Sequence, residues 1–137
     1  MPTEPMPRSG IVPYLFCEDA GALLDFYARV FGWTELSRWH DDDGNVRNGE
    51  VAVGDTELWV DGGGPSYWEK FGRGPAPWIG VWVDDLDAFC ARVRSVGVEI
   101  GDPVERNFGV RMTGEVVDPA GNRWSFMQRT GLPTPPR

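Results

Sequence analysis

One local pattern occurs twice in this chain: a short apolar run, an acidic pair, an amphipathic stretch and a glycine. The first copy spans residues 11–32 and the second spans residues 78–97. Each copy predicts a strand, a helix N-cap, a helix and a glycine at which the helix ends. The apolar residues at helical spacing are Leu23, Tyr27, Val30 and Phe31 in the first copy and Leu86, Phe89, Cys90, Val93 and Val96 in the second.

A hairpin pattern follows each predicted helix. Residues 49–53 pair with 56–60 in the first half, residues 114–117 pair with 123–128 in the second, and Gly-Glu-Val occurs in both halves. A repeat distance of roughly 65 residues exceeds the usual period of a solenoid. We therefore predict an α+β fold in which one βαβββ unit is duplicated within a single domain, 1–137. Module one covers about 9–61, a Gly/Pro-rich linker about 62–77 and module two about 78–129.

Composition and charge exclude several classes of protein. The 137 residues are 41% hydrophobic and include seven Trp, which suits one well-packed domain. A formal net charge of -8 argues against a nucleic-acid partner, because phosphate binding requires clustered Lys and Arg. An acidic surface attracts cationic ligands instead.

Apolar runs and cysteines indicate the cellular location. No apolar run approaches the roughly 20 residues that cross a bilayer, and residues 1–8 lack the apolar region of a secretory signal. We expect a cytoplasmic protein with no membrane partner. Cys17 and Cys90 lie far apart within apolar stretches, so we expect two buried free thiols.

A series of motifs in a particular order carries a family resemblance. They are Val-Pro-Tyr-Leu at 12–15, Asp-Phe-Tyr-Ala-Arg-Val-Phe-Gly-Trp at 25–33, Val-Trp-Val-Asp-Asp-Leu-Asp at 81–87, Phe-Gly at 108–109 and Asp-Pro-Ala-Gly-Asn at 118–122. In order and spacing the chain resembles the glyoxalase/bleomycin-resistance/dioxygenase superfamily, also called vicinal oxygen chelate proteins. The resemblance implies two βαβββ modules that form a curved mixed sheet, with an inner cleft, helices outside and a homodimeric assembly.

The same resemblance implies where a metal would be bound in the enzymes of the family. The positions that match the family's His or Glu ligands hold Val12, Trp78 and Ser125, and only Glu57 fits a ligand position. The sole histidine, His40, lies outside that pattern. Because a divalent ion requires several converging imidazole or carboxylate donors, we predict no metal, no cofactor and no catalytic residue.

Alternation along the strands assigns the side chains to two faces. If Val12, Trp78 and Ser125, which stand at the ligand positions of the family, face the cleft, then Gly80 and Arg123 face it too. The side chains predicted to contact a ligand are Tyr14, Phe16, Trp39, Glu57, Trp59, Asp61, Trp78, Trp82, Phe108, Arg111, Ser125 and Met127. The side chains predicted to pack against the helices are Leu15, Leu58, Val60, Ile79, Val81, Val83, Trp124 and Phe126. The predicted cleft is thus aromatic and partly acidic.

Three functions fit this cleft. The first is a metal-free protein that, like the bleomycin-resistance proteins it most resembles, sequesters a planar natural product such as a cationic or amphipathic antibiotic. The second is an enzyme of the family, a lyase, isomerase or dioxygenase: either a metal-independent lyase or isomerase that would use Glu57 with Arg111 or Arg123, or a metal enzyme with a divergent ligand set. The third is a ligand-binding or regulatory paralogue, since a fold alone does not determine function.

Other prominent residues have structural interpretations. Residues 118–122 predict a tight turn. Residues 41–44 predict a hairpin tip and not a calcium loop, because Ala52 stands where such a loop needs Glu. Trp33 suits core packing or ligand contact equally, and His40 suits the surface. The linker aromatics, which suit a dimer interface or a lid over the cleft, are Tyr67, Trp68 and Phe71.

Overall fold

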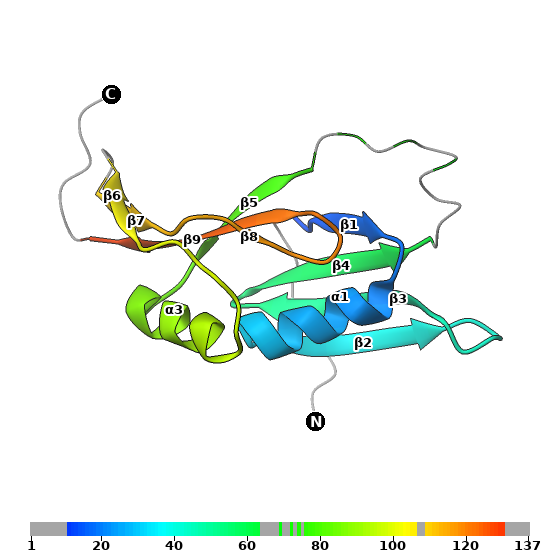
Figure 1. Cartoon of the computed structure of the whole chain (residues 1–137). Coiled ribbons are helices and arrows are strands. Elements are labelled where there is room, and N and C mark those ends of the chain that lie inside the picture. The colour runs from blue at the N-terminus through cyan, green and yellow to red at the C-terminus, as the bar shows by residue number, and fades with distance from the viewer. Residues whose placement is uncertain are drawn as a thin grey trace.

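The computed structural model describes residues 11–63, 69, 72, 74, 76–106 and 109–130. The first half contains β1 (Tyr14–Cys17), α1 (Ala20–Phe26), the π-helical turn η1 (Tyr27–Phe31), β2 (Thr34–His40), β3 (Val46–Val53) and β4 (Thr56–Gly62). The second half contains β5 (Trp78–Trp82), α3 (Leu86–Ser95), β6 (Val104–Arg106), β7 (Val110–Met112), β8 (Val116–Val117) and β9 (Arg123–Arg129). Figure 1 shows this order along the chain.

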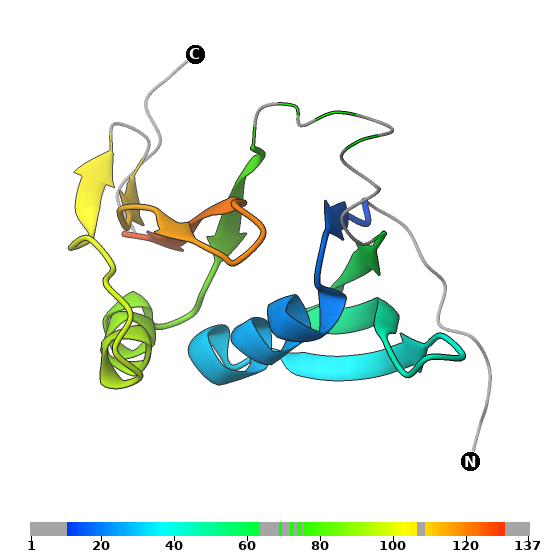
Figure 2. The ribbon, with the colours of Figure 1, turned by 45° about the vertical axis from the view of Figure 1, so that its right-hand side comes forward.

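The strands form two mixed sheets, which confirms the predicted α+β fold with two βαβββ modules. Sheet A has the order β1-β4-β3-β2, and sheet B has the order β5-β9-β7-β6 with β8 also paired to β9. In each sheet the first strand of the module runs parallel to the last one, β1 to β4 and β5 to β9. Within the chain the two sheets are separate and do not form one curved sheet. In Figure 2 the two helices lie side by side, with sheet A on the right and sheet B on the upper left.

Local chemistry at the helix ends follows the sequence pattern. The second acid of each acidic pair is the N-cap: Asp19 accepts a hydrogen bond from the Ala22 amide and Asp85 accepts one from the Ala88 amide, both at 3.0 Å. Gly32 ends the first helix with a φ of 74°, a left-handed conformation that glycine adopts without steric cost. The sequence pattern therefore located both helices correctly.

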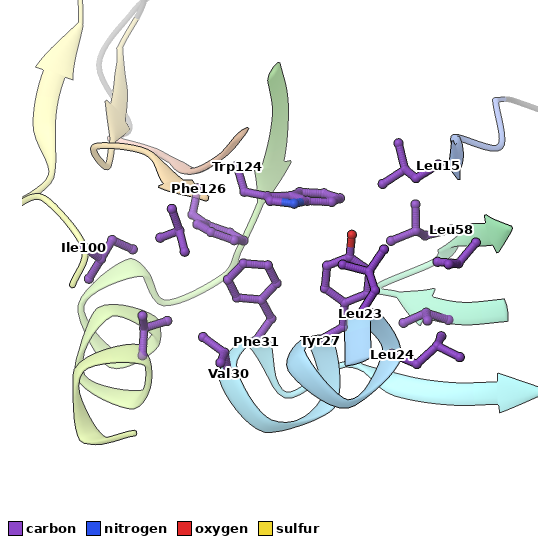
Figure 3. Packing of buried hydrophobic residues seen from close by; sticks show 14 of the residues in the cluster. Leu15, Leu23, Leu24, Tyr27, Val30, Phe31, Leu58, Ile100, Trp124 and Phe126 are labelled. Carbon is purple, nitrogen blue, oxygen red and sulfur yellow. The ribbon is translucent and has the colours of Figure 1, made fainter. Parts of the chain in front are cut away.

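The hydrophobic core lies where both sheets meet the helices. Figure 3 shows Trp124 and Phe126 of β9 directed toward Tyr27 and Phe31 of η1, with leucines of α1 and sheet A beside them. The ring centroids of Phe31 and Phe126 are 5.0 Å apart, and those of Tyr27 and Trp124 are 5.6 Å apart. The predicted helix-facing side chains Leu15, Leu58, Val60, Trp124 and Phe126 are buried, and Ile79, Val81 and Val83 are partly buried against them.

Trp33 belongs to this core and not to a ligand site. Its ring lies 4.7 Å from that of Phe31 and 5.1 Å from that of Trp124. Of the two interpretations that the sequence allowed, core packing is the correct one.

Asp118 is the polar centre of the core. The buried carboxylate accepts hydrogen bonds from the Tyr27 hydroxyl at 2.7 Å and from the Trp124 indole N–H at 2.8 Å. It also accepts bonds from the amides of Ala120 and Asn122 and from the Asn122 side chain. The predicted turn at 118–122 thereby joins module two to the first helix of module one. Burial and the Asp118 charge raise the pKa of the Tyr27 hydroxyl, so its proton stays in place.

The second predicted turn, at 41–44, is also present. Asp41 accepts hydrogen bonds from the amides of Asp43 and Asn45 and closes the hairpin between β2 and β3. Cys17 and Cys90 are buried free cysteines, as predicted. Among the described residues, no helix has both the length and the apolar composition that a bilayer crossing requires.

Strands β2, β6 and β7 were not predicted individually. β6 is exposed along its whole length, and β2 is exposed or half-buried throughout and interrupted by register shifts. Edge strands of this kind bury neither face fully, so their sequences show little alternation of apolar and polar residues. The linker aromatics Tyr67, Trp68 and Phe71 lie outside the described residues.

Tyr27→Phe is expected to lower the free energy of unfolding by about 1.5–3 kcal/mol, because it removes a buried hydrogen bond to a charged group. Urea denaturation measures the change. Tyr14→Phe is the control: its hydroxyl bonds Asp61 at 3.3 Å at the surface, and we expect a change within about 0.5 kcal/mol. Equal effects of the two substitutions would contradict the role assigned to Asp118.

Stability is expected to fall at alkaline pH. Burial raises the pKa of the Cys17 thiol from 9.0 to about 12. Burial also raises the pKa of the Tyr27 hydroxyl above its usual value of 10.0. The native state therefore holds both protons more tightly than the unfolded chain. This stabilisation is complete below pH about 9 and is lost as the pH rises toward about 12. Urea unfolding across that range should show a shallower decline in Cys17→Ala than in the wild-type protein, and parallel declines would contradict the assignment.

Candidate functional site

One side of sheet A is aromatic and acidic, as the pairing between its strands shows. Tyr14 pairs with Trp59 and Phe16 with Asp61 across β1 and β4. Across β3 and β2, Glu50 pairs with Trp59 and Ser37, and Asn48 pairs with Asp61 and Trp39. Paired residues share a face, and this face is turned away from the core. We call these side chains, together with Glu57, the A face.

A cavity of about 250 Å³ opens on the A face. Its lining residues are Tyr14, Trp39, Asn48, Gly49, Glu50, Trp59 and Val60. Three rings and a carboxylate therefore converge on one hollow. The sequence predicted Tyr14, Trp39 and Trp59 as ligand contacts, and the structure brings them together.

The ring geometry of the A face is held by hydrogen bonds to acids. Tyr14 and Trp59 meet edge to face with centroids 5.9 Å apart. The Trp59 indole donates to Glu57 at 3.1 Å and the Tyr14 hydroxyl donates to Asp61 at 3.3 Å. Desolvation, followed by the Asp61 charge, raises the pKa of Tyr14, so the hydroxyl remains a donor. The rings are thus oriented before any ligand arrives.

Sequence reasoning missed the polar residues contributed by β2 and β3. Glu50 accepts a hydrogen bond from the Ser37 hydroxyl at 2.8 Å, and it lines the cavity together with Asn48. A charged residue within the predicted strand 49–53 was a usable signal. The facing of that strand is set by its register with β4, which the local sequence pattern does not determine.

Sheet B carries a second aromatic face, which we call the B face. Trp78 and Trp82 of β5 are more than half exposed. They pair with Arg123 and Met127 of β9 respectively, whose side chains lie on the same face. The Trp78 indole donates to Ser125 at 2.9 Å, and the Arg129 guanidinium lies 4.6 Å from the centroid of a Trp82 ring. The two indoles of the B face therefore already have partners within the chain.

Three predicted site residues require correction or lie outside the described chain. Arg111 pairs with Gln128 on the helix side of sheet B and forms an ion pair with Asp87 of α3 at 3.1 Å, so it does not lie on the B face. The structure therefore places Arg111 on the opposite side of the sheet from the predicted cleft, a facing that depends on the register of β7 with β9. Ser125 is on the B face, but it is only 1% exposed beneath Trp78 and is not available for direct ligand contact. Phe108 lies outside the described residues.

The residues at the ligand positions of the family do not fit a divalent metal. Valine, tryptophan and a buried serine occupy three of these positions, and Glu57 alone provides a carboxylate. Within the described ranges, no three His, Cys, Asp or Glu side chains form a group that could hold a metal ion. Catalysis through a bound metal therefore has no donor set among these residues.

Comparisons with known proteins agree on one family. The model of the Glyoxalase/Bleomycin resistance protein/Dioxygenase superfamily matches residues 10–126. The uncharacterized protein Rv0887c of Mycobacterium tuberculosis is 30% identical over 122 residues, which cover 85% of this chain and 72% of that protein.

Solved structures share the fold. TioX from Micromonospora sp. ML1 has a TM-score of 0.73 at 27% identity, covering 89% of this chain and 99% of its own. TnmS3, an antibiotic binding protein from Streptomyces sp. CB03234, has a TM-score of 0.65 at 25% identity, covering 88% and 97%. Lactoylglutathione lyase from Agrobacterium tumefaciens has a TM-score of 0.66 at 18% identity, covering 90% and 96%, and shows similarity of fold alone.

Arg111→Gln tests the correction at β7. Because exposed ion pairs contribute little to stability, we expect the thermal midpoint to remain almost unchanged. Quenching of tryptophan fluorescence by planar aromatic drugs should also be unchanged, since the side chain faces α3. Loss of quenching in this variant would return Arg111 to the site.

Proposed function

Because this chain belongs to the glyoxalase/bleomycin resistance protein/dioxygenase superfamily, we propose that it binds and sequesters a planar aromatic natural product, cationic or amphipathic, without transforming it. The observation that carries this proposal is the cavity walled by Tyr14, Trp39 and Trp59. Indole and phenol rings offer flat apolar surfaces at little entropic cost, and each good aromatic contact contributes on the order of 1 kcal/mol. Such a cavity suits a fused-ring ligand such as an antibiotic.

The size of the cavity supports a homodimer. At about 250 Å³ it is smaller than the roughly 300–1,000 Å³ of sites for drug-sized ligands. Its lining comes from sheet A alone, so one side of a bound ligand would remain in solvent. We infer that a second copy of the chain covers that side and enlarges the site.

The charges of the two faces favour pairing between copies. Outside the lining of the cavity the A face carries Glu57 and Asp61, whereas Arg123 and Arg129 lie on the B face. A twofold axis that places the A face of one chain against the B face of the other would bring unlike charges and exposed rings together twice. The expected assembly is therefore a symmetric dimer with two equivalent sites.

Sequestration would act by lowering the concentration of free drug, which gives resistance without chemistry. TnmS3, one of the proteins of similar fold, is an antibiotic binding protein, and this supports the same role here. We propose that the protein acts in the cytoplasm, where many antibiotics meet their targets.

The enzymatic alternative has less support from the site. It required Glu57 to act with Arg111 or Arg123. Arg111 pairs with Asp87 beside α3, and Arg123 lies on sheet B, whereas Glu57 lies on sheet A. A general acid and base must both reach the reacting atoms, and within one chain these groups do not share a face, so the reaction would require Arg123 of the partner subunit to reach Glu57 across the proposed dimer.

Titration of the protein with planar aromatic antibiotics should quench its tryptophan fluorescence. Trp82→Ala is expected to weaken binding several-fold while light scattering still reports a dimer, because the indole lies outside the core and the other rings and charges of the two faces remain to hold the copies together. The absence of quenching by any planar drug would contradict the proposed function. Chemical turnover of a bound drug would favour the enzymatic alternative.

A further inference from the structure

We propose that the two modules divide the recognition of a ligand: the cationic group of an aromatic ligand binds at Glu50 on the A face and is excluded from Trp82 on the B face. This assignment rests on the proposed function and adds to it the position and the chemistry of one contact. The ligand is an aromatic ring system that carries an amine or guanidine substituent.

Glu50 has the surroundings that a cation requires. Its carboxylate lines the cavity at the position opposite Trp59, and one of its oxygens accepts the Ser37 hydroxyl at 2.8 Å. A carboxylate has about four acceptor sites, so one hydroxyl leaves most of its capacity available. Within the described residues Glu50 forms no ion pair. Its negative charge is therefore oriented but not neutralised.

The neighbouring rings strengthen the attraction for a cation. Tyr14, Trp39 and Trp59 line the same cavity as Glu50. The faces of aromatic rings attract cations through their quadrupole, and a half-buried carboxylate adds a full charge of the same sign. Asp61, whose carboxylate accepts the Tyr14 hydroxyl, adds a second negative charge on the A face. A ring that enters this cavity with an amine on its edge meets flat surfaces and a counter-charge together.

The B face has the opposite preference. The Arg129 guanidinium already lies over Trp82, in the position that a cationic ligand would take. Arg123 lies on the same face at the opposite end of β5, where it pairs with Trp78 across the strands and forms an ion pair with Glu115 at 3.5 Å. A ligand cation at Trp82 would have to displace the Arg129 guanidinium. The B face can therefore contribute ring contact, but it repels a positive substituent.

Two probes of equal ring size test this division. 9-Aminoacridine is a planar cation at neutral pH, and acridone is a planar neutral molecule of similar shape. In fluorescence titrations of the full-length protein, Glu50→Gln should weaken the affinity for 9-aminoacridine about tenfold, which corresponds to about 1.4 kcal/mol. The affinity for acridone should stay within about twofold of the wild-type value. Glu99→Gln is the matched control: it removes one exposed acid beyond α3 and should change neither affinity.

Arg129→Gln tests the other half of the division. Removal of the guanidinium from Trp82 should strengthen the binding of 9-aminoacridine about twofold and leave the binding of acridone unchanged. Weaker binding of the cation to this variant would overturn the exclusion at Trp82.

The outcomes separate this inference from the proposed function. If both probes bind the wild-type protein and Glu50→Gln weakens them equally or not at all, Glu50 does not select for charge and the inference fails, while the proposed function stands. If neither probe binds the wild-type protein, the proposed function and the inference both fail. If Glu99→Gln weakens 9-aminoacridine binding as much as Glu50→Gln does, the effect comes from net charge and not from a contact with Glu50, and the inference fails.

Discussion

The fold depends on the carboxylate of Asp118. A buried charge is costly unless hydrogen bonds satisfy it, and here five donor groups surround the carboxylate, two of them on Tyr27 and Trp124. Because Tyr27 belongs to module one and Asp118 to module two, this interaction ties the two modules together. The aromatic cluster of Phe31, Trp124 and Phe126 packs around the same junction.

This arrangement determines where ligands can bind. Since the helix-facing side of each sheet is used by the shared core, only the opposite sides remain open, and these carry the exposed rings Tyr14, Trp39, Trp78 and Trp82. The duplicated modules have then diverged in charge, with acidic side chains on the A face and arginines on the B face. A single duplicated fold thus offers two surfaces that stack rings but prefer opposite charges.

Much of this was accessible from the sequence, and the part that was missed has a physical cause. Helices, their aspartate caps and the alternation along β1, β4, β5 and β9 follow from local pattern, so the facing of Trp59 and Trp82 was predictable. The positions of Glu50 and Arg111 depend on the registers of β3 and β7, which are set by pairing with distant strands. The burial of Ser125 beneath Trp78 likewise depends on a contact between residues 47 positions apart.

Two turns share the pattern Asp-x-x-Gly-Asn. They show most clearly which features local sequence determines and which depend on tertiary packing. In each, the aspartate accepts hydrogen bonds from the backbone amides two and four residues later, and the glycine has a positive φ, 83° at Gly44 and 89° at Gly121. The sequence by itself determined this local structure, because short-range hydrogen bonds and glycine's freedom suffice for it. Only the tertiary structure decided that Asp41 remains at a hairpin tip, where it pairs with Arg47, while Asp118 becomes the buried link between modules. Burial depends on which distant segments pack against a turn, and five residues do not encode that.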